Sequence, residues 1–176
     1  MPIVPDDKDW TWVLDRSCPD CGFDASTCAV VAVPALVRGN ALRWRQLLEG
    51  GAIHPGRPHP AVWSSLEYAC HVRDVYDRYD YRISLMLTQR NPLFPNWDQD
   101  ATAISYRYEE QVPADVVARL MATAETLAMR LEGVSACDRQ RPGRRSDGAR
   151  FTVDSIARYM VHDPIHHVWD VTTSGG

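Results

Sequence analysis

The hydrophobic and polar positions of this chain follow the period of an α-helix in four separate stretches. The first begins near Pro34, where the missing backbone N–H has no helical partner to lose, and it stops at Gly50 and Gly51. Its apolar residues recur at helical spacing and mark one buried face: Leu36, Val37, Ala41, Trp44, Leu47 and Leu48. The residues before Pro34 show no helical period of apolar positions. We therefore expect an irregular segment over residues 1–33 and a helical domain over 34–176.

The second helical stretch has a clear beginning and leads into a long connection. Ser64 followed by Glu67 is the pattern of a capping box, in which each side chain satisfies a free N–H of the first turn. We expect this helix to run to about Thr88. The connection QRNPLFPNWDQDATAISYRYEEQ is rich in Pro, Asn and Asp and exceeds 20 residues. It is long enough to cross a bundle and to leave the second and third helices parallel.

The third and fourth helices are separated by an arginine-rich loop. The third is expected to open at Pro113 and to close at Gly133. The fourth begins after Thr152, a good N-cap, and reaches about Val171. The link between the first and second helices is short, which favours antiparallel neighbours. The pattern therefore predicts an all-α four-helix bundle with one long crossover between the second and third helices.

Composition and charge exclude some classes of protein. The chain has 176 residues, of which 45% are hydrophobic and 24% charged, as expected for one folded core. A net charge of −4 argues against a nucleic-acid binder, and no stretch approaches the roughly 18 apolar residues of a membrane helix. The acidic N-terminus does not resemble a signal peptide, so we expect a cytoplasmic protein. Its five cysteines are then reduced thiols or metal ligands rather than disulfides.

Histidines give the strongest indication of chemistry. His162 and His166, in HDPIHH, are four residues apart and project from one helix face, which suits two ligands of one ion. His71, in EYACHVRDV on the second helix, can supply a third nitrogen. Three imidazoles leave open positions on the ion, and open positions are typical of a reactive metal. We predict a metal site at His71, His162 and His166.

The other residues of HDPIHH leave alternatives open. Histidines four apart also occur on helix surfaces and core edges that bind no metal. Asp163 and Asp170 either orient the ligand imidazoles or lie on a solvated face, and His167 is a neighbour of the ligand pair. Pro164 removes a helix hydrogen bond and is expected to kink the helix. Such a kink either spoils the geometry of the pair or tilts both ligands toward the bundle axis.

The order and spacing of these motifs resemble the DinB-like family of metal-binding four-helix proteins. WSSLEYACHVRDV followed by RFTVDSIARYMVHDPIHHVWDV is similar to a bacterial subgroup of that family, over roughly residues 34–172. The resemblance implies an up-down-down-up bundle, a three-histidine site at His71, His162 and His166, zinc or nickel, and a homodimer. Family members of known activity are metal-dependent enzymes that use low-molecular-weight thiols, such as S-transferases and maleylpyruvate isomerases.

The cysteines of the N-terminal segment have two interpretations. Cys18 and Cys21, in CPDC, form either a redox pair or half of a zinc site; otherwise they are reduced thiols. A zinc site needs further ligands, for which Cys28 and either His54 or His59 are candidates.

Arginines gather in the loop CDRQRPGRRSDGAR. They can hold an anionic substrate or a thiol cofactor, because Arg pairs well with carboxylates, and we assign this binding to Arg144 and Arg145. The alternative is a solvated loop.

Two functions follow from these features. The first is a metal-dependent enzyme that activates a low-molecular-weight thiol or water for transfer to a small electrophile. The alternative is a non-catalytic metal-binding stress-response protein, in which the ion mainly holds two helices together.

Overall fold

Four long helices make up most of the computed structural model, which describes residues 9–51 and 56–173. They are α1 (Val33–Glu49), α2 (Ser65–Thr88), α4 (Pro113–Glu132) and α5 (Val153–Thr173). Each lies within a residue or two of the stretch that the hydrophobic period predicts. The four predicted helices are therefore confirmed.

The predicted caps account for where the helices begin. Ser64 Oγ accepts a hydrogen bond from the backbone N–H of Glu67, and Ser64 N–H donates to Glu67 Oε2 over 2.8 Å. Arg57 donates to the same buried carboxylate and ties the preceding loop to the start of α2. Thr152 Oγ1 accepts from the backbone N–H of Ser155 and caps α5. These contacts fix the first turns of both helices that carry candidate ligands.

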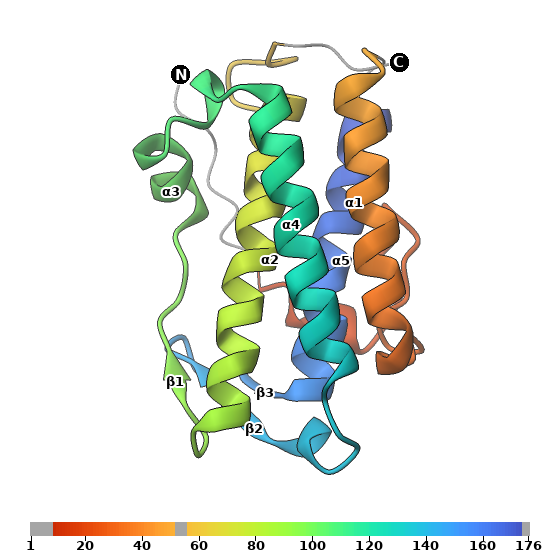
Figure 1. The fold of residues 1–176 in the computed structure, drawn as a ribbon, viewed down its shortest axis with the longest axis vertical. Coiled ribbons are helices and arrows are strands. Elements are labelled where there is room, and N and C mark those ends of the chain that lie inside the picture. Colours follow the sequence, from red (N-terminus) through yellow and green to blue (C-terminus); the bar gives the residue numbers. More distant parts are fainter. Residues whose placement is uncertain (1–8, 52–55, 174–176) are drawn as a thin grey trace.

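The bundle has the up-down-down-up order, as Figure 1 shows: α1 and α5 run one way, and α2 and α4 run the other. Helices α4 and α5 each pack against both α1 and α2, whereas α1 and α2 barely touch. The expectation that α1 and α2 are neighbours is therefore wrong, because α4 and α5 lie between them. Apolar residues of all four helices fill the core, including Trp44, Tyr76, Leu120, Leu127, Ile156 and Met160.

A small sheet at one end of the bundle makes the all-α prediction incomplete. Strand β1 (Leu93–Phe94) pairs in parallel with β2 (Pro142–Arg145), and β2 pairs antiparallel with β3 (Arg150–Thr152). The arginine-rich loop is thus a hairpin, and Gly148 makes its turn with a φ of 100°. The strands are two to four residues long, too short for an alternating pattern to reveal them. The crossover also contains the short helix α3 (Gln99–Ser105).

The N-terminal segment runs along the bundle rather than away from it. It contains two 3₁₀ turns, Thr11–Leu14 and Val30–Ala32, and the first of them contacts α5. Val13 and Cys18 are buried, and Arg158 of α5 donates to the carbonyl of Ala25 over 3.0 Å. Further along the chain, 3₁₀ turns form at Tyr108–Glu110 and Asp138–Gln140. No helix within the described residues is long and apolar enough to cross a membrane.

Candidate metal centre

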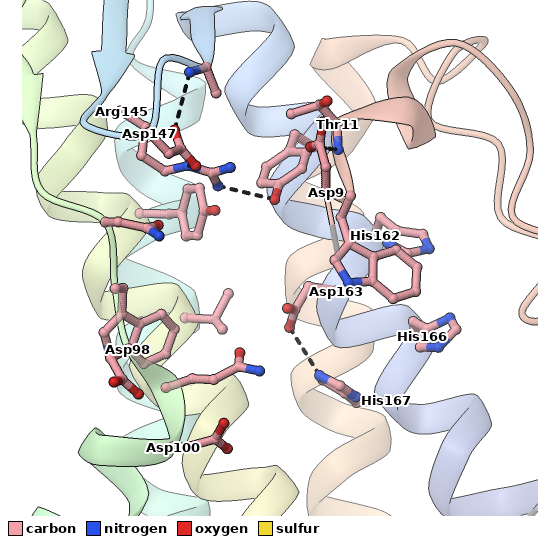
Figure 2. A pocket seen from close by; sticks show the side chains of 18 of the residues that line it. Asp9, Thr11, Asp98, Asp100, Arg145, Asp147, His162, Asp163, His166 and His167 are labelled. Atoms are coloured by element: carbon pink, nitrogen blue, oxygen red, sulfur yellow. Dashed lines mark hydrogen bonds and ion pairs between the residues drawn. The ribbon is translucent and has the colours of Figure 1, made fainter. Parts of the chain in front are cut away.

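Helix α5 carries two ligand pairs, offset from one another by one residue. His162 and His166 form one pair, and Asp163 and His167 form the other. Adjacent residues of a helix point about 100° apart, so the two pairs face different directions. Figure 2 shows Asp163 and His167 pointing toward each other, and His162 and His166 on the side of α5 away from Asp98. The helix continues through Pro164, whose carbonyl accepts a 2.9 Å hydrogen bond from the buried Asn40 side chain.

The first group joins α2 to α5 through His71, Asp163 and His167. Asp163 Oδ1 lies 3.3 Å from His71 Nε2 and 3.6 Å from His167 Nε2. These separations are long for charge-assisted hydrogen bonds, which are about 2.7–2.9 Å. They match two ligands of one tetrahedral ion, because ligands about 2.0–2.1 Å from the ion are about 3.3 Å apart. Asp163 Oδ1 is buried and has no hydrogen-bond partner among the described residues.

The protonation of this group suits a cation. Burial by itself raises the pKa of Asp163, but positive charge on His71 and His167, when these imidazoles are protonated, outweighs that effect and lowers this pKa; a divalent cation bound in place of those protons would act in the same direction. His167 Nδ1 lies 2.8 Å from Asp170 Oδ2, a hydrogen bond that places the ring proton on Nδ1. His167 Nε2 is then left with its lone pair toward Asp163. One carboxylate and imidazole nitrogens are ordinary ligands for zinc and nickel.

Aromatic rings cover the buried member of the group. His71 is fully buried; the Trp97 ring stacks on its imidazole at 5.2 Å, and Trp63 packs beside it at 5.3 Å. Asp163 and His167, by contrast, line a pocket of about 1440 Å³. Asp98 and Asp100 of the crossover line the same pocket, across from Asp163 and His167 in Figure 2. An ion held here would be anchored in the core and would face the pocket.

The second group joins the N-terminal segment to α5. Donor atoms of Cys18, Cys21, His162 and His166 all lie within 4.8 Å of one another. Cys18 Sγ is 3.5 Å from His166 Nδ1. Burial lowers the pKa of His162 to about 4, with a smaller effect from His166, so this imidazole is neutral at physiological pH. Burial raises the pKa of the Cys21 thiol to about 11 when no cation is present.

Most of the chain matches a single protein family. Residues 37–171 match the family model described as the DinB superfamily. This chain belongs to the DinB superfamily. The match begins after Cys18 and Cys21, so the two cysteines lie outside the residues that match the family model.

A solved structure supports the fold of this DinB protein. YfiT from Bacillus subtilis, described as a probable metal-dependent hydrolase with an unusual four-helix bundle topology, is similar with a TM-score of 0.62 and 16% sequence identity. The similarity covers 98% of this chain and 93% of YfiT. At this identity the likeness shows the fold alone. No protein of curated function matches the sequence significantly.

The structure does not bring the three predicted ligands of this DinB protein into one group. His71 lies with Asp163 and His167, whereas His162 and His166 lie with Cys18 and Cys21. Asp163 and His167 belong to the first group, whereas the sequence pattern placed them beside the ligands rather than among them. Their spacing of four residues equals that of the predicted pair and was the available signal.

The other residues that the sequence offers as ligands or binding residues do not lie together in one site either. Arg145 lines the pocket, where it donates to Asp147 and to the Tyr159 hydroxyl, while Arg144 is exposed and lies outside the pocket lining. Cys28 and His59 are not part of the cysteine group, and His54 falls outside the described residues. Which of these residues bind a ligand stays a prediction.

Proposed function

We propose that this DinB-superfamily protein is a divalent-metal-dependent hydrolase that acts on a small molecule, with its metal held by His71, Asp163 and His167. One observation carries the proposal. Three donors from two helices converge at the spacing of ligands around one ion, and one of them, the buried Asp163 Oδ1, has no hydrogen-bond partner among the described residues. The group borders a large pocket, as an ion that meets a substrate requires.

Metal chemistry suits a group with three protein ligands. A divalent ion held by three side chains keeps at least one open position, lowers the pKa of a water molecule there and polarises a substrate oxygen. Zinc accepts a set of two imidazoles and one carboxylate, and imidazole also suits nickel, so we retain both metals. The description of YfiT as a probable metal-dependent hydrolase supports the choice of water as the nucleophile.

The residues of the chain have distinct roles in this proposal. Asp170 holds the proton of His167 on Nδ1 and so keeps Nε2 available as a ligand. Trp97 and Trp63 shield His71 from water and fix its ring plane. Arg145 lines the pocket, and its side chain is 12% exposed. Its guanidinium is positively charged and is therefore suited to bind an anionic group of the substrate.

Activity with defined metals tests the proposal. The full-length protein, loaded with zinc or nickel, is assayed against a panel of small esters, amides and phosphate esters. We expect metal-dependent hydrolysis that His71→Ala and His167→Ala abolish and that His59→Ala, at an exposed histidine, leaves unchanged. Turnover that appears only with added thiols and electrophiles would replace hydrolysis by the thiol-transfer reaction. No turnover with either metal would favour the non-catalytic metal-binding protein.

Three expectations from the sequence accompany this proposal as predictions: a low-molecular-weight thiol as cosubstrate, a homodimer and a cytoplasmic location. The assay with and without thiol tests the first. Light scattering and fractionation test the other two.

A further inference from the structure

The four-ligand group on the other side of α5 shares no ligand with the proposed active site. We propose that Cys18, Cys21, His162 and His166 form a closed zinc site that holds the N-terminal segment against α5. Two of these ligands lie before the residues that the family model matches. The inference rests on the geometry of the group and does not depend on the hydrolase proposal.

The turn that carries the two cysteines is shaped for chelation. Cys18 and Cys21 are separated by two residues, the spacing that places two sulfur ligands on one ion. Gly22 follows with a φ of 72°, a conformation that glycine adopts without strain. Its N–H donates to the carbonyl of Cys18 over 3.0 Å, and Cys18 N–H donates to the carbonyl of Phe23 over 2.9 Å. These backbone bonds hold the turn closed.

The donor atoms have the spacing of a tetrahedral site. A sulfur about 2.3 Å and a nitrogen about 2.0–2.1 Å from one ion are about 3.6 Å apart. The Cys18 Sγ and His166 Nδ1 atoms are 3.5 Å apart. The other ring nitrogen of His166 faces Asp170 at 3.6 Å, so a carboxylate lies behind this ligand. Two thiolates and two imidazoles select zinc over the harder divalent ions.

Burial indicates that the group is built to hold an ion. Cys18 is 1% exposed and His162 is 4% exposed. His162 Nε2 is buried and has no hydrogen-bond partner among the described residues. Such an atom is destabilising unless something binds it. A zinc ion would satisfy the group, and its binding would release the two thiol protons to solvent.

The site also affects the pocket. Four protein ligands leave no open position, so this zinc is structural rather than reactive. The Trp10 ring packs on His162 and His166, with ring centres 5.6 and 5.4 Å apart. Trp10 and its neighbour Asp9 line the pocket, as does Asp20 between the cysteines. The zinc would therefore hold one wall of the pocket in place.

Cobalt substitution tests the proposal with a readout that needs no activity. The full-length protein is reduced, stripped of metal and loaded with Co²⁺, and its absorption spectrum is recorded. We expect thiolate-to-cobalt charge-transfer absorption and the visible bands of tetrahedral cobalt. Cys18→Ser and Cys21→Ser should each abolish the charge-transfer band. Cys28→Ser, the matched control at a nearby thiol outside the group, and His71→Ala should keep it.

Zinc content and wild-type spectroscopy complete the test. Cys21→Ser should bind about one zinc ion per chain fewer than the wild-type protein, whether or not the His71 group also binds zinc. X-ray absorption at the zinc edge should show sulfur neighbours in the wild type, so the result does not depend on the folding of a variant. A reduced wild-type protein without charge-transfer absorption or sulfur neighbours overturns the proposal. So does a charge-transfer band that survives the double change Cys18→Ser and Cys21→Ser.

Discussion

The two ligand groups on α5 share a helix but differ in nearly every property that determines what a metal does. His162 and His166 face the N-terminal segment, where two cysteines complete a set of four donors. Asp163 and His167 face α2, where His71 completes a set of only three, and members of both pairs line the pocket. A set of four with sulfur is typical of structural zinc, whereas a set of three with an open side is typical of catalysis. In the two proposals, one helical segment thus supplies ligands to both kinds of site.

The difference arises from the helical period. A step of one residue turns a side chain by about 100°, so two interleaved pairs with a spacing of four cannot share one ion. What each pair meets then depends on the element packed against that side. The packing of the N-terminal segment and of α2, rather than the residue types on α5, determines the two roles.

Removing one ligand from each group should have the largest effects and should distinguish the two groups most clearly. We expect His167→Ala to lower kcat/KM by at least about a thousandfold, because it takes a ligand from the open group. His166→Ala should keep measurable turnover and instead lower the melting temperature, because it opens the structural group. Steady-state kinetics and thermal unfolding of both variants distinguish the roles. Reversed results would interchange the two assignments.

The next largest effect is expected from the hydrogen bonds that anchor α5 at Pro164. Asn40 of α1 donates to the carbonyl of Pro164 and accepts from the Tyr76 hydroxyl over 2.8 Å. Asn40→Ala removes both of these hydrogen bonds and deprives the buried Tyr76 hydroxyl of its acceptor, so it should lower the free energy of unfolding by about 2–3 kcal/mol. Tyr76→Phe removes one of the two bonds and should cost about 1 kcal/mol. Chemical denaturation measures both, and equal losses would contradict this role of Asn40.

Asp170 lies next to a histidine of each group, so a change at this residue compares the zinc affinities of the two groups. It accepts from His167 at 2.8 Å but lies 3.6 Å from His166. Asp170→Asn should weaken zinc binding at the open group by about 10–100-fold, the usual effect of losing a carboxylate behind a histidine ligand. The closed group has three other ligands and a longer contact, so its affinity should change less. Competition with a zinc chelator measures both affinities, and a greater loss at the closed group would contradict the assignment.

The smallest expected effect concerns the two arginines next to each other in β2. Arg145→Ala should raise KM for an anionic substrate several-fold, because it removes a cation from the pocket wall. Arg144→Ala is the matched control, since this side chain is exposed and lies outside the pocket lining. Equal KM values for the two variants would show that the pocket does not bind its substrate through this charge.

Much of the fold can be predicted from the sequence because its signals are local. The Ser64–Glu67 capping box and the glycine after α4 mark helix ends within a few residues. The long crossover between α2 and α4 is sufficient to imply parallel helices. The sheet could not be predicted in the same way, because its longest strand is PGRR, which has neither alternation nor β-branched residues.

The site was harder to predict because its decisive contacts are distant in sequence. His71 on α2 and His167 on α5 meet only through the packing of the bundle, and either pair on α5 has the spacing to join His71. Cys18 lies 148 residues from His166. No local pattern reports that contact. The sequence therefore indicates the ligand types and the helix, but not which pair belongs to which group.

Anomalous diffraction from crystals of the zinc-loaded protein, collected at the zinc absorption edge, would show directly whether α5 binds one ion or two. Two separate peaks are expected. One should lie among Cys18, Cys21, His162 and His166, and the other among His71, Asp163 and His167. A single peak bound by His71, His162 and His166 would contradict the separation of the groups and would restore the site predicted from the sequence.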